Sequence, residues 1–327
     1  MSRRLNVVLA LGLIAVVTVF FRTLAPSATA GIEGAARDFF TLSISVIIES
    51  LPFVFLGILV SILVQVWLPP DVLFRWLPAR PVLRRMVLSL LGMLTPVCEC
   101  GNVPMARGLM LKGLSVSESM TFLFAAPILN PVTIITTQQA FGWDSGILAW
   151  RIAGGFLIAN LIGWIYSRHR EPRRLLTARF DAACLTDDHD HRSQGRLRQS
   201  VDLFQREANA MMPALFIGAG LAGLIQVGVP RNVLVTLGSD IVWSVLALML
   251  LAFVVSICST VDAFFILSFG ATFLPGSIVA FLVFGPMIDV KMLALLRTTF
   301  TARTLLQLTV LIALSAAALG WGVNLAS

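Results

Sequence analysis

Charged residues are scarce in this chain of 327 residues: Asp, Glu, Lys and Arg make up 13% of it, whereas 57% is hydrophobic. Soluble domains carry about 25% charged residues. A chain this apolar cannot hide its hydrophobic side chains inside one soluble core, because many of them would have to face water. The composition therefore indicates a protein whose solvent is the lipid bilayer.

Disulfide frameworks and familiar catalytic motifs are also lacking. The four cysteines are Cys98, Cys100, Cys184 and Cys258. They do not form the framework of a small secreted domain, and Cys98 is too near Cys100 in sequence to bridge it readily. The sequence contains no Walker motif, no HExxH motif and no nucleophile–base arrangement. We therefore expect neither an enzyme nor a protein with a cofactor.

The net charge of +7 does not indicate a nucleic-acid partner. Nucleic-acid binding would require the basic residues to form a patch on a soluble domain. Here they lie between apolar runs, where basic residues record which side of a membrane protein is cytoplasmic. We expect a multi-pass protein of the bacterial inner (cytoplasmic) membrane.

The N-terminal residues 1–34 allow two interpretations. Arg3 and Arg4, the apolar run Leu5–Phe21 and the small residues Ala28-Thr29-Ala30 resemble a cleavable signal peptide. The alternative, which we favour, is a retained N-terminal transmembrane helix, because the helices that follow need no separate export signal. In both cases the chain after Phe21 begins outside.

Apolar runs of about 20 residues, enough to cross about 30 Å of hydrocarbon, recur along the chain. They predict an all-α polytopic membrane protein. Two further apolar segments, Met86–Leu111 and Ile241–Phe273, are interrupted near their middles. The uninterrupted runs are Leu5–Phe21, Phe39–Trp67, Val116–Thr137, Gly146–Tyr166, Ala208–Val229, Gly276–Leu296 and Leu305–Val323.

A polar linker, residues 167–200, separates two membrane repeats, residues 35–166 and 201–327. Leu51-Pro-Phe-Val-Phe-Leu-Gly57 aligns with Met212-Pro-Ala-Leu-Phe-Ile-Gly218. Shared Gln, Pro and Cys residues continue the alignment at a nearly constant offset. Chance apolar similarity can imitate a repeat, but shared residues of these types at one offset favour an internal duplication.

The distribution of Lys and Arg predicts that the two repeats have opposite orientations. If both interrupted segments cross the membrane, 11 of the 24 basic residues lie inside and 13 outside. If each segment enters halfway and returns as a re-entrant hairpin, 20 lie inside, Lys291 among them, and 4 outside, which the positive-inside rule favours. The four outside are Arg22, Arg37, Arg151 and Arg231. The linker is then cytoplasmic, and the chain is an inverted repeat whose broken helices meet near the midplane, a recurrent plan of transporters.

The most informative segment is Thr95–Pro104, with sequence TPVCECGNVP. Its prolines and glycine disfavour a continuous helix, so we expect an unwound stretch. That stretch presents four candidate substrate-binding residues: Cys98, Glu99, Cys100 and Asn102. Thiolates favour copper(I), zinc and similar centres. The alternative is that the cysteines serve only as small buried hydrophobes.

Cys258 lies in the second interrupted segment. If the inverted repeat holds, Cys98, Cys100 and Cys258 converge at the midplane as ligands for a soft metal or a trivalent metalloid. Asp262 would then face Asn102. Cys184, in the linker, is expected to be incidental. The nearby Asp187–His191 tract could bind metal, but a flexible solvated loop is the interpretation we favour.

Four carboxylates within apolar segments are candidates for proton coupling: Glu49, Glu99, Asp262 and Asp289. A charged side chain at the centre of a transmembrane helix costs at least about 2.5–3.5 kcal/mol, so each needs a reason to be there. The alternative is that some only accept hydrogen bonds from unwound backbone. Pro127-x-x-Asn130 and Pro286-x-x-Asp289 are expected to break helices beside the hairpin tips, which makes Asn130 a further substrate-binding candidate.

The segment Thr95–Pro104, followed by Ala126-Pro-Ile-Leu-Asn-Pro131, resembles the bacterial predicted-permease family, which includes the ArsP-type exporters of trivalent organoarsenicals. The resemblance covers about residues 35–325. It implies a permease, substrate contact by the hairpin that carries Cys98 and Cys100, and secondary transport. The lack of a nucleotide-binding motif agrees with secondary transport.

The sequence thus predicts a proton-coupled exporter of a thiophilic solute, such as a trivalent organoarsenical or a soft metal ion. One alternative is a permease for a small organic or sulfur-containing solute, with structural cysteines. Another is a membrane partner subunit that does not transport by itself, but such a subunit would not need central polar residues in hairpins. The expected partners are a small solute and the lipid bilayer, and the sequence specifies no oligomeric state.

Overall fold

The computed structural model describes residues 32–68, 75, 77–94, 97–186, 196–228, 242–270 and 273–326. Helices dominate, and no β-strand occurs among these residues, as predicted for an all-α protein. The expected N-terminal helix Leu5–Phe21, the Thr95-Pro96 dipeptide and the Asp187–His191 tract lie outside the described residues. The chain divides after Asp38 into two units, and the second unit, which begins at Phe39, contains the helical bundle.

Within the described residues, six helices are long and apolar enough to cross a membrane, and they match six of the seven predicted spans. The seventh predicted span, Leu5–Phe21, lies outside the described residues. The spans found are Ala36–Trp67, Val116–Phe141, Ile147–Ser167, Arg196–Val227, Pro275–Leu296 and Ala302–Ala326. The fifth expected run begins at Arg196 and not at Ala208, because the polar residues before the apolar run continue the same helix. A multi-pass membrane protein is thereby confirmed.

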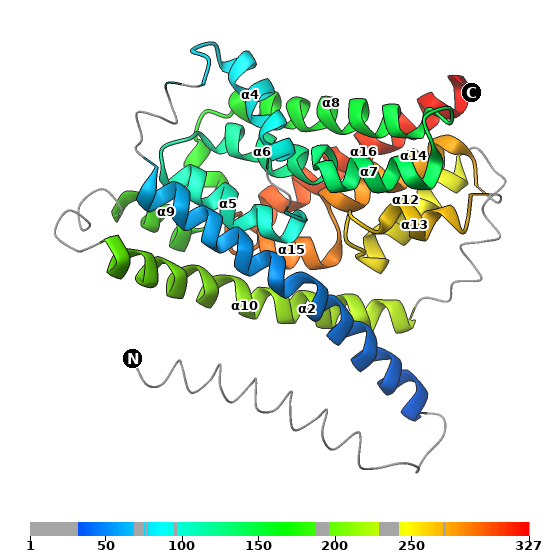
Figure 1. Ribbon diagram of the computed structural model, residues 1–327, viewed down its shortest axis with the longest axis horizontal. Helices are drawn as coiled ribbons and strands as arrows, with labels where there is room; N and C mark the ends of the chain where they lie inside the picture. Colours follow the sequence, from blue (N-terminus) through cyan, green and yellow to red (C-terminus); the bar gives the residue numbers. More distant parts are fainter. Residues whose placement is uncertain are drawn as a thin grey trace. The chain divides into compact units, whose positions relative to one another are not determined.

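Two long helices, α2 (Ile32–Ile62) and α10 (Arg196–Gly228), run antiparallel on one side of the bundle (Figure 1). The rings of Phe55 and Phe204 stack at 5.8 Å between centroids. Near the other end of the contact, a Cβ on Gly223 would lie 2.2 Å from Ser43 Oγ, so the glycine permits close approach. A π-helical turn, Leu63–Trp67, ends α2.

Each interrupted apolar segment forms a helical hairpin. The first consists of α4 (Pro81–Leu90), extended by a 3-10 turn to Leu94, and α5 (Glu99–Leu111). The second consists of α12 (Trp243–Val255) and α13 (Asp262–Leu267). The two ends of each hairpin lie near each other. Arg84 of α4 pairs at 3.5 Å with Glu118, in the helix that follows α5. Ser244 of α12 lies 2.7 Å from Ser277, in the helix that follows α13.

The hairpins enter the bundle from opposite ends. Leu176 of the linker bridges to Phe300, where α16 (Ala302–Ala326) begins, and we call this end the linker end. The start of α6 (Val116–Leu129), after the first hairpin, lines a cavity together with Leu176. At the start of α14 (Pro275–Met287), after the second hairpin, Gly276 N donates to Asn324 Oδ1 near the far end of α16. At 1.5 Å per residue, Asn324 lies about 35 Å from the linker end of this helix. That the halves are an inverted repeat stays a prediction.

A second pair of helix breaks follows the hairpins, as the sequence predicts. At Asn130, α6 gives way to α7 (Pro131–Phe141), and at Asp289, α14 gives way to α15 (Val290–Leu296). Both residues have extended backbone and cap the next helix, with their side chains accepting from Val132 N and Met292 N. Asn and Asp are favoured at this position because they satisfy an otherwise unbonded N–H group.

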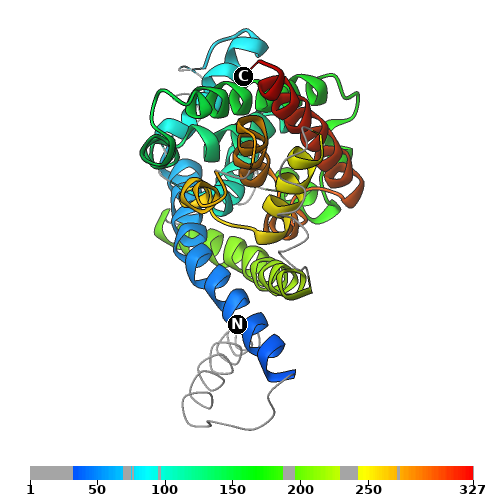
Figure 2. The same cartoon turned by 90° about the vertical axis from the view of Figure 1, so that its right-hand side faces the viewer.

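Part of the polar linker is folded. After α8 (Ile147–Ser167) come a 3-10 turn, Pro172–Leu175, and α9 (Ala178–Thr186). Thr177 N donates to Thr299 O at 2.9 Å, and Thr301 N donates to Leu175 O at 3.0 Å. The linker is therefore attached to the second half over these residues. In Figures 1 and 2, α12 and α14 lie between the α2–α10 pair and the α8–α16 pair.

Candidate functional site

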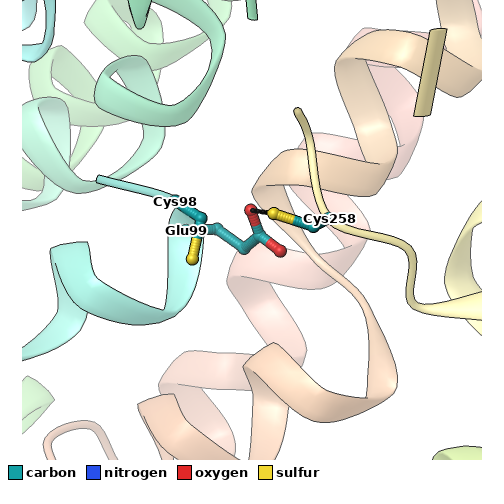
Figure 3. A group of neighbouring side chains, drawn as sticks. All are labelled: Cys98, Glu99 and Cys258. Carbon is teal, nitrogen blue, oxygen red and sulfur yellow. Dashed lines mark hydrogen bonds between the residues drawn. The ribbon is translucent and has the colours of Figure 1, made fainter. Parts of the chain in front are cut away.

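The tips of the two hairpins meet inside the bundle. Cys98 directly precedes α5, Glu99 is its first residue, and Cys258 lies in the turn between α12 and α13. One ligand atom from each of these three residues lies within 4.8 Å of the others. Figure 3 shows the Glu99 side chain reaching from the first hairpin to Cys258 on the second. All three residues are almost completely buried.

Glu99 is the centre of the contacts between the tips. Its Oε2 accepts hydrogen bonds from the Ser259 hydroxyl at 3.1 Å, the Ser259 amide at 3.4 Å and the Cys258 thiol at 3.7 Å. Its Oε1 lies 3.2 Å from Lys291 Nζ on α15, and both side chains are 1% exposed. A carboxylate in such surroundings is tolerated only when it is paired and hydrogen-bonded.

The three buried thiols lie close together, and of these three cysteines only Cys100 lies within a helix. The Cys98 thiol lies within 4.8 Å of the Cys258 thiol, and Cys100 follows two residues further along the chain. Residue 98 has extended backbone and caps α5, and its carbonyl accepts from Gly101 N at 3.1 Å and from Asn102 N at 3.3 Å. The expectation of unwound backbone at Cys100 and Asn102 is therefore wrong, because the helix restarts at Glu99.

Asn102 is fully buried, and neither of its side-chain polar atoms has a hydrogen-bond partner among the described residues. A buried amide without partners is rare in folded proteins and calls for an explanation such as a ligand. Asn102 lies one helical turn after Cys98. Its contact with a substrate stays a prediction.

Asn130 holds the first hairpin in place. Its amide nitrogen donates to Val97 O at 2.9 Å, and its amide oxygen accepts from Val132 N at 2.9 Å. Both groups of the side chain are therefore used within the protein. In this structure Asn130 positions the residue before Cys98, and its direct contact with a substrate stays a prediction.

Asp262 is held by Arg151 and forms no hydrogen bond with Asn102, the residue that the inverted repeat places opposite it. The Nη2–Oδ2 distance is 2.6 Å and the Nη1–Oδ1 distance is 3.0 Å. Arg151 also donates to Thr137 Oγ1 at 2.6 Å, and its Nη2 lies 3.5 Å from Ser259 O. The pair thus fixes the turn that carries Cys258 and Ser259.

The other two predicted carboxylates lie around this centre. Asp289 caps α15, two residues before Lys291, and its Oδ2 has no hydrogen-bond partner among the described residues. Glu49 lies half-buried in α2, close enough to interact electrostatically with Lys291 and Glu99. Cys184 is in α9, and the three-residue ligand cluster does not include it.

Sequence reasoning missed Lys291, Arg151 and Ser259. It placed Lys291 with the cytoplasmic basic residues and Arg151 outside, whereas both side chains are about 1% exposed. The signal was present, because each cation lies within an apolar run, where an ionisable residue is a functional candidate. No comparable signal marks Ser259, a serine among several in the second half.

Two comparisons connect the chain to known proteins. A family described as "Predicted permease", of the ArsP type, matches residues 35–325. The UPF0718 protein YcgR of Bacillus subtilis is 34% identical over 273 residues, which cover 80% of this chain and 89% of that protein. A Streptococcus mutans protein named as a two-component membrane permease complex subunit is 32% identical over 81% of this chain and 87% of its own length. No solved structure matches.

Proposed function

Since the chain belongs to the predicted permease family, we propose that it is a permease that exports a thiophilic solute, a trivalent organoarsenical or a soft metal ion. The observation that carries this proposal is the meeting of Cys98, Glu99 and Cys258 at the hairpin tips, within 4.8 Å of one another. Thiolate sulfur binds soft and thiophilic centres in preference to hard ions. Cys100, two residues after Cys98 and likewise buried, is a third thiol available to the same cargo.

The site has features that suit transient binding of cargo. Its ligands come from two hairpins, so a relative movement of the hairpins separates Cys98 from Cys258 and releases the cargo. Glu99 bridges the hairpins through Ser259 and Cys258, so its carboxylate responds to the same movement. Asn102 supplies unpartnered polar groups one turn away.

We also propose proton exchange as the energy source, with Glu49 and Asp289 as the carriers. Glu99 and Asp262 are each paired with a buried cation, which favours ligand and structural roles for them. Asp289 has a free carboxylate oxygen among the described residues, and Glu49 is half-buried. Asp289→Asn and Glu49→Gln are expected to reduce accumulation driven by a pH gradient in everted vesicles.

A second candidate function follows from the Streptococcus mutans relative, which is named as a subunit of a permease complex. The present chain would then transport only together with a partner membrane protein. Co-purification from its own host under mild detergent tests this. A stoichiometric partner, required for transport by reconstituted vesicles, would support the complex.

The experiment that tests the cargo site exchanges Cys98 and Cys258 for serine, singly and together. Serine is close in size but a much harder ligand, so binding should fall while packing changes little. Direct binding of methylarsenite, copper(I) and zinc by the purified protein should show high affinity for one of them, with a loss of at least about tenfold in each variant. Resistance of cells to that solute should fall in parallel.

Cys184→Ser is the matched control, since Cys184 lies in α9, away from the hairpin tips. It should bind and protect like the parent protein. If the Cys98 and Cys258 variants bind every tested solute as well as the parent does, the cysteines are packing residues. The alternative of a small organic or sulfur-containing solute would then take the place of the thiophilic one.

A further inference from the structure

A cavity of about 950 Å³ opens at the linker end of the bundle. Both membrane halves and the linker contribute to it. On the membrane side it is lined by Met110 of α5, Leu203 of α10 and Gln65 of the π-helical turn after α2. On the linker side it is lined by Arg174 and Asp181. Its size is in the range of small-molecule sites.

One buried ion pair separates this cavity from the cysteines. Along α5 the order is Glu99, then Arg107 about 12 Å further on at 1.5 Å per residue, then Met110 in the cavity wall. Along α10, Glu207 lies one turn deeper than Leu203. Arg107 and Glu207 are therefore placed between the cavity and the hairpin tips on both helices.

The Arg107 guanidinium connects four elements at this level. Its Nε lies 2.8 Å from Glu207 Oε2, and its Nη2 lies 3.2 Å from Glu207 Oε1. Its Nη1 donates to Thr298 O at 3.2 Å and to Thr299 Oγ1 at 3.1 Å, in the turn after α15. Its Cζ also lies 4.2 Å from the centroid of the Phe180 ring of α9. Arg107 and Phe180 thus join the first half, the second half and the linker in one buried contact.

The opposite side of the cysteine site has a comparable barrier. Arg151, in the first full turn of α8, and Thr137, near the end of α7, lie away from the linker end, and Arg151 holds Asp262 there. Both the Arg107 and the Arg151 pairs connect the first half to the second. In alternating access, a barrier on one side of the binding site opens while the barrier on the other side stays closed.

We propose that Arg107, Glu207 and Phe180 form the linker-end gate of the permeation path, closed in this structure, and that the cavity is the vestibule in front of it. The inference rests on the proposed cargo site at Cys98, Glu99 and Cys258. It gives the polar linker a role, because α9 contributes the Phe180 ring that covers the Arg107 guanidinium. Opening requires the Arg107–Glu207 pair to separate and α9 to move away from it.

The test measures how fast a small charged methanethiosulfonate reagent reacts with the buried thiols from the linker side, in membrane vesicles. Cys184→Ser serves as the background, so that reaction reports on Cys98, Cys100 and Cys258. Arg107→Gln and Glu207→Gln should each raise the rate about tenfold or more, because the closed state loses its ion pair. The charge exchange Arg107→Glu with Glu207→Arg should return the rate toward that of the parent.

Arg84→Gln is the matched control, because it removes an ion pair with Glu118 that lies within the first half. Its rate should equal the parent's, and an equal increase would overturn the gate in favour of general loosening. Unchanged rates in folded Arg107→Gln would also overturn it. If the charge variants do not fold, Phe180→Ala must raise the rate, with Phe180→Tyr unchanged. The labelling reaction needs no cargo. The gate proposal can therefore be refuted while the cargo-site proposal is supported, and the cargo-site proposal can be refuted while the gate proposal is supported.

Discussion

Arg151 and Asp262 join α8 of the first half to α13 of the second, with 2.6 Å between Nη2 and Oδ2. The pairs Arg107–Glu207 and Glu99–Lys291 also join the halves. Among the described residues, every ion pair in which both side chains are less than 10% exposed crosses between the halves in this way. We infer that these buried charges specify how the two halves dock. The attraction within each pair offsets the cost of removing its charges from water only when both partners are present.

The Arg151–Asp262 pair provides the first prediction. Arg151→Met leaves Asp262 buried without its cation, so the free energy of unfolding should fall by about 3–5 kcal/mol. The double variant Arg151→Met with Asp262→Leu removes both charges and should be markedly more stable than the single one. Unfolding of the purified protein in mixed micelles, followed as a function of denaturing detergent, measures the difference.

Arg84→Met serves as the control, because the Arg84 side chain is 26% exposed and its pair with Glu118 should contribute at most about 1 kcal/mol. A single Arg151→Met variant as stable as the parent would show that the pair does not dock the halves.

The crossing of α2 and α5 provides the second prediction. A Cβ on Gly57 would lie 2.2 Å from Gly101 O, so the two backbones touch two residues from Glu99. Gly57→Ala must push α2 away from α5 and should destabilise the protein by about 1–3 kcal/mol. It should also weaken cargo binding, because Gly101 follows Cys100 directly.

Gly220→Ala on α10 is the matched substitution, since a Cβ there meets nothing within 4 Å. Alanine should be neutral or stabilise this helix by about 0.5–1 kcal/mol. Equal effects of the two alanines on the same unfolding transition would argue against the close crossing.

The helix breaks could be predicted because their causes are local. Asn130 and Asp289 each follow a proline within a turn and cap the next helix through their own side chains. The interruption before Glu99 likewise follows from a proline-containing segment. Spans could be predicted from length and composition alone, since about 20 apolar residues cross the hydrocarbon in any fold.

The partners of the buried charges could not be predicted in the same way. Lys291 and Glu99 are separated by 192 residues, and their contact depends on how α15 packs against the first hairpin. The helical conformation of Cys100 depends on where α5 begins, which is at Glu99, directly after the extended residue Cys98. Phe180 lies in the polar linker, and only the fold brings its ring over Arg107.

Topology is the third prediction, and the linker end should face the cytoplasm. The basic residues Arg107, Arg174, Arg297 and Arg303 all lie near this end, as the positive-inside rule requires of the cytoplasmic side. A fluorescent protein inserted between Thr186 and Arg196 should fluoresce, and alkaline phosphatase inserted there should be inactive. Active phosphatase at this position would show that the linker end faces the outside. It would also contradict the argument, from the distribution of basic residues, that the two hairpins enter from opposite sides.

The last prediction separates the two roles of the Glu99–Lys291 pair, in folding and in cargo binding. Glu99→Gln leaves Lys291 without its carboxylate, and Lys291→Met leaves Glu99 without its cation. Both single variants should lose about 3–5 kcal/mol of stability. The double variant, Glu99→Gln with Lys291→Met, buries no net charge at this position and should regain most of the stability. It should still bind the cargo identified for the parent more weakly, because an amide is a poorer ligand than a carboxylate. Unfolding and cargo binding are measured on the same preparations. A double variant that is stable and binds like the parent would limit Glu99 to a structural role and leave the thiols as the ligands.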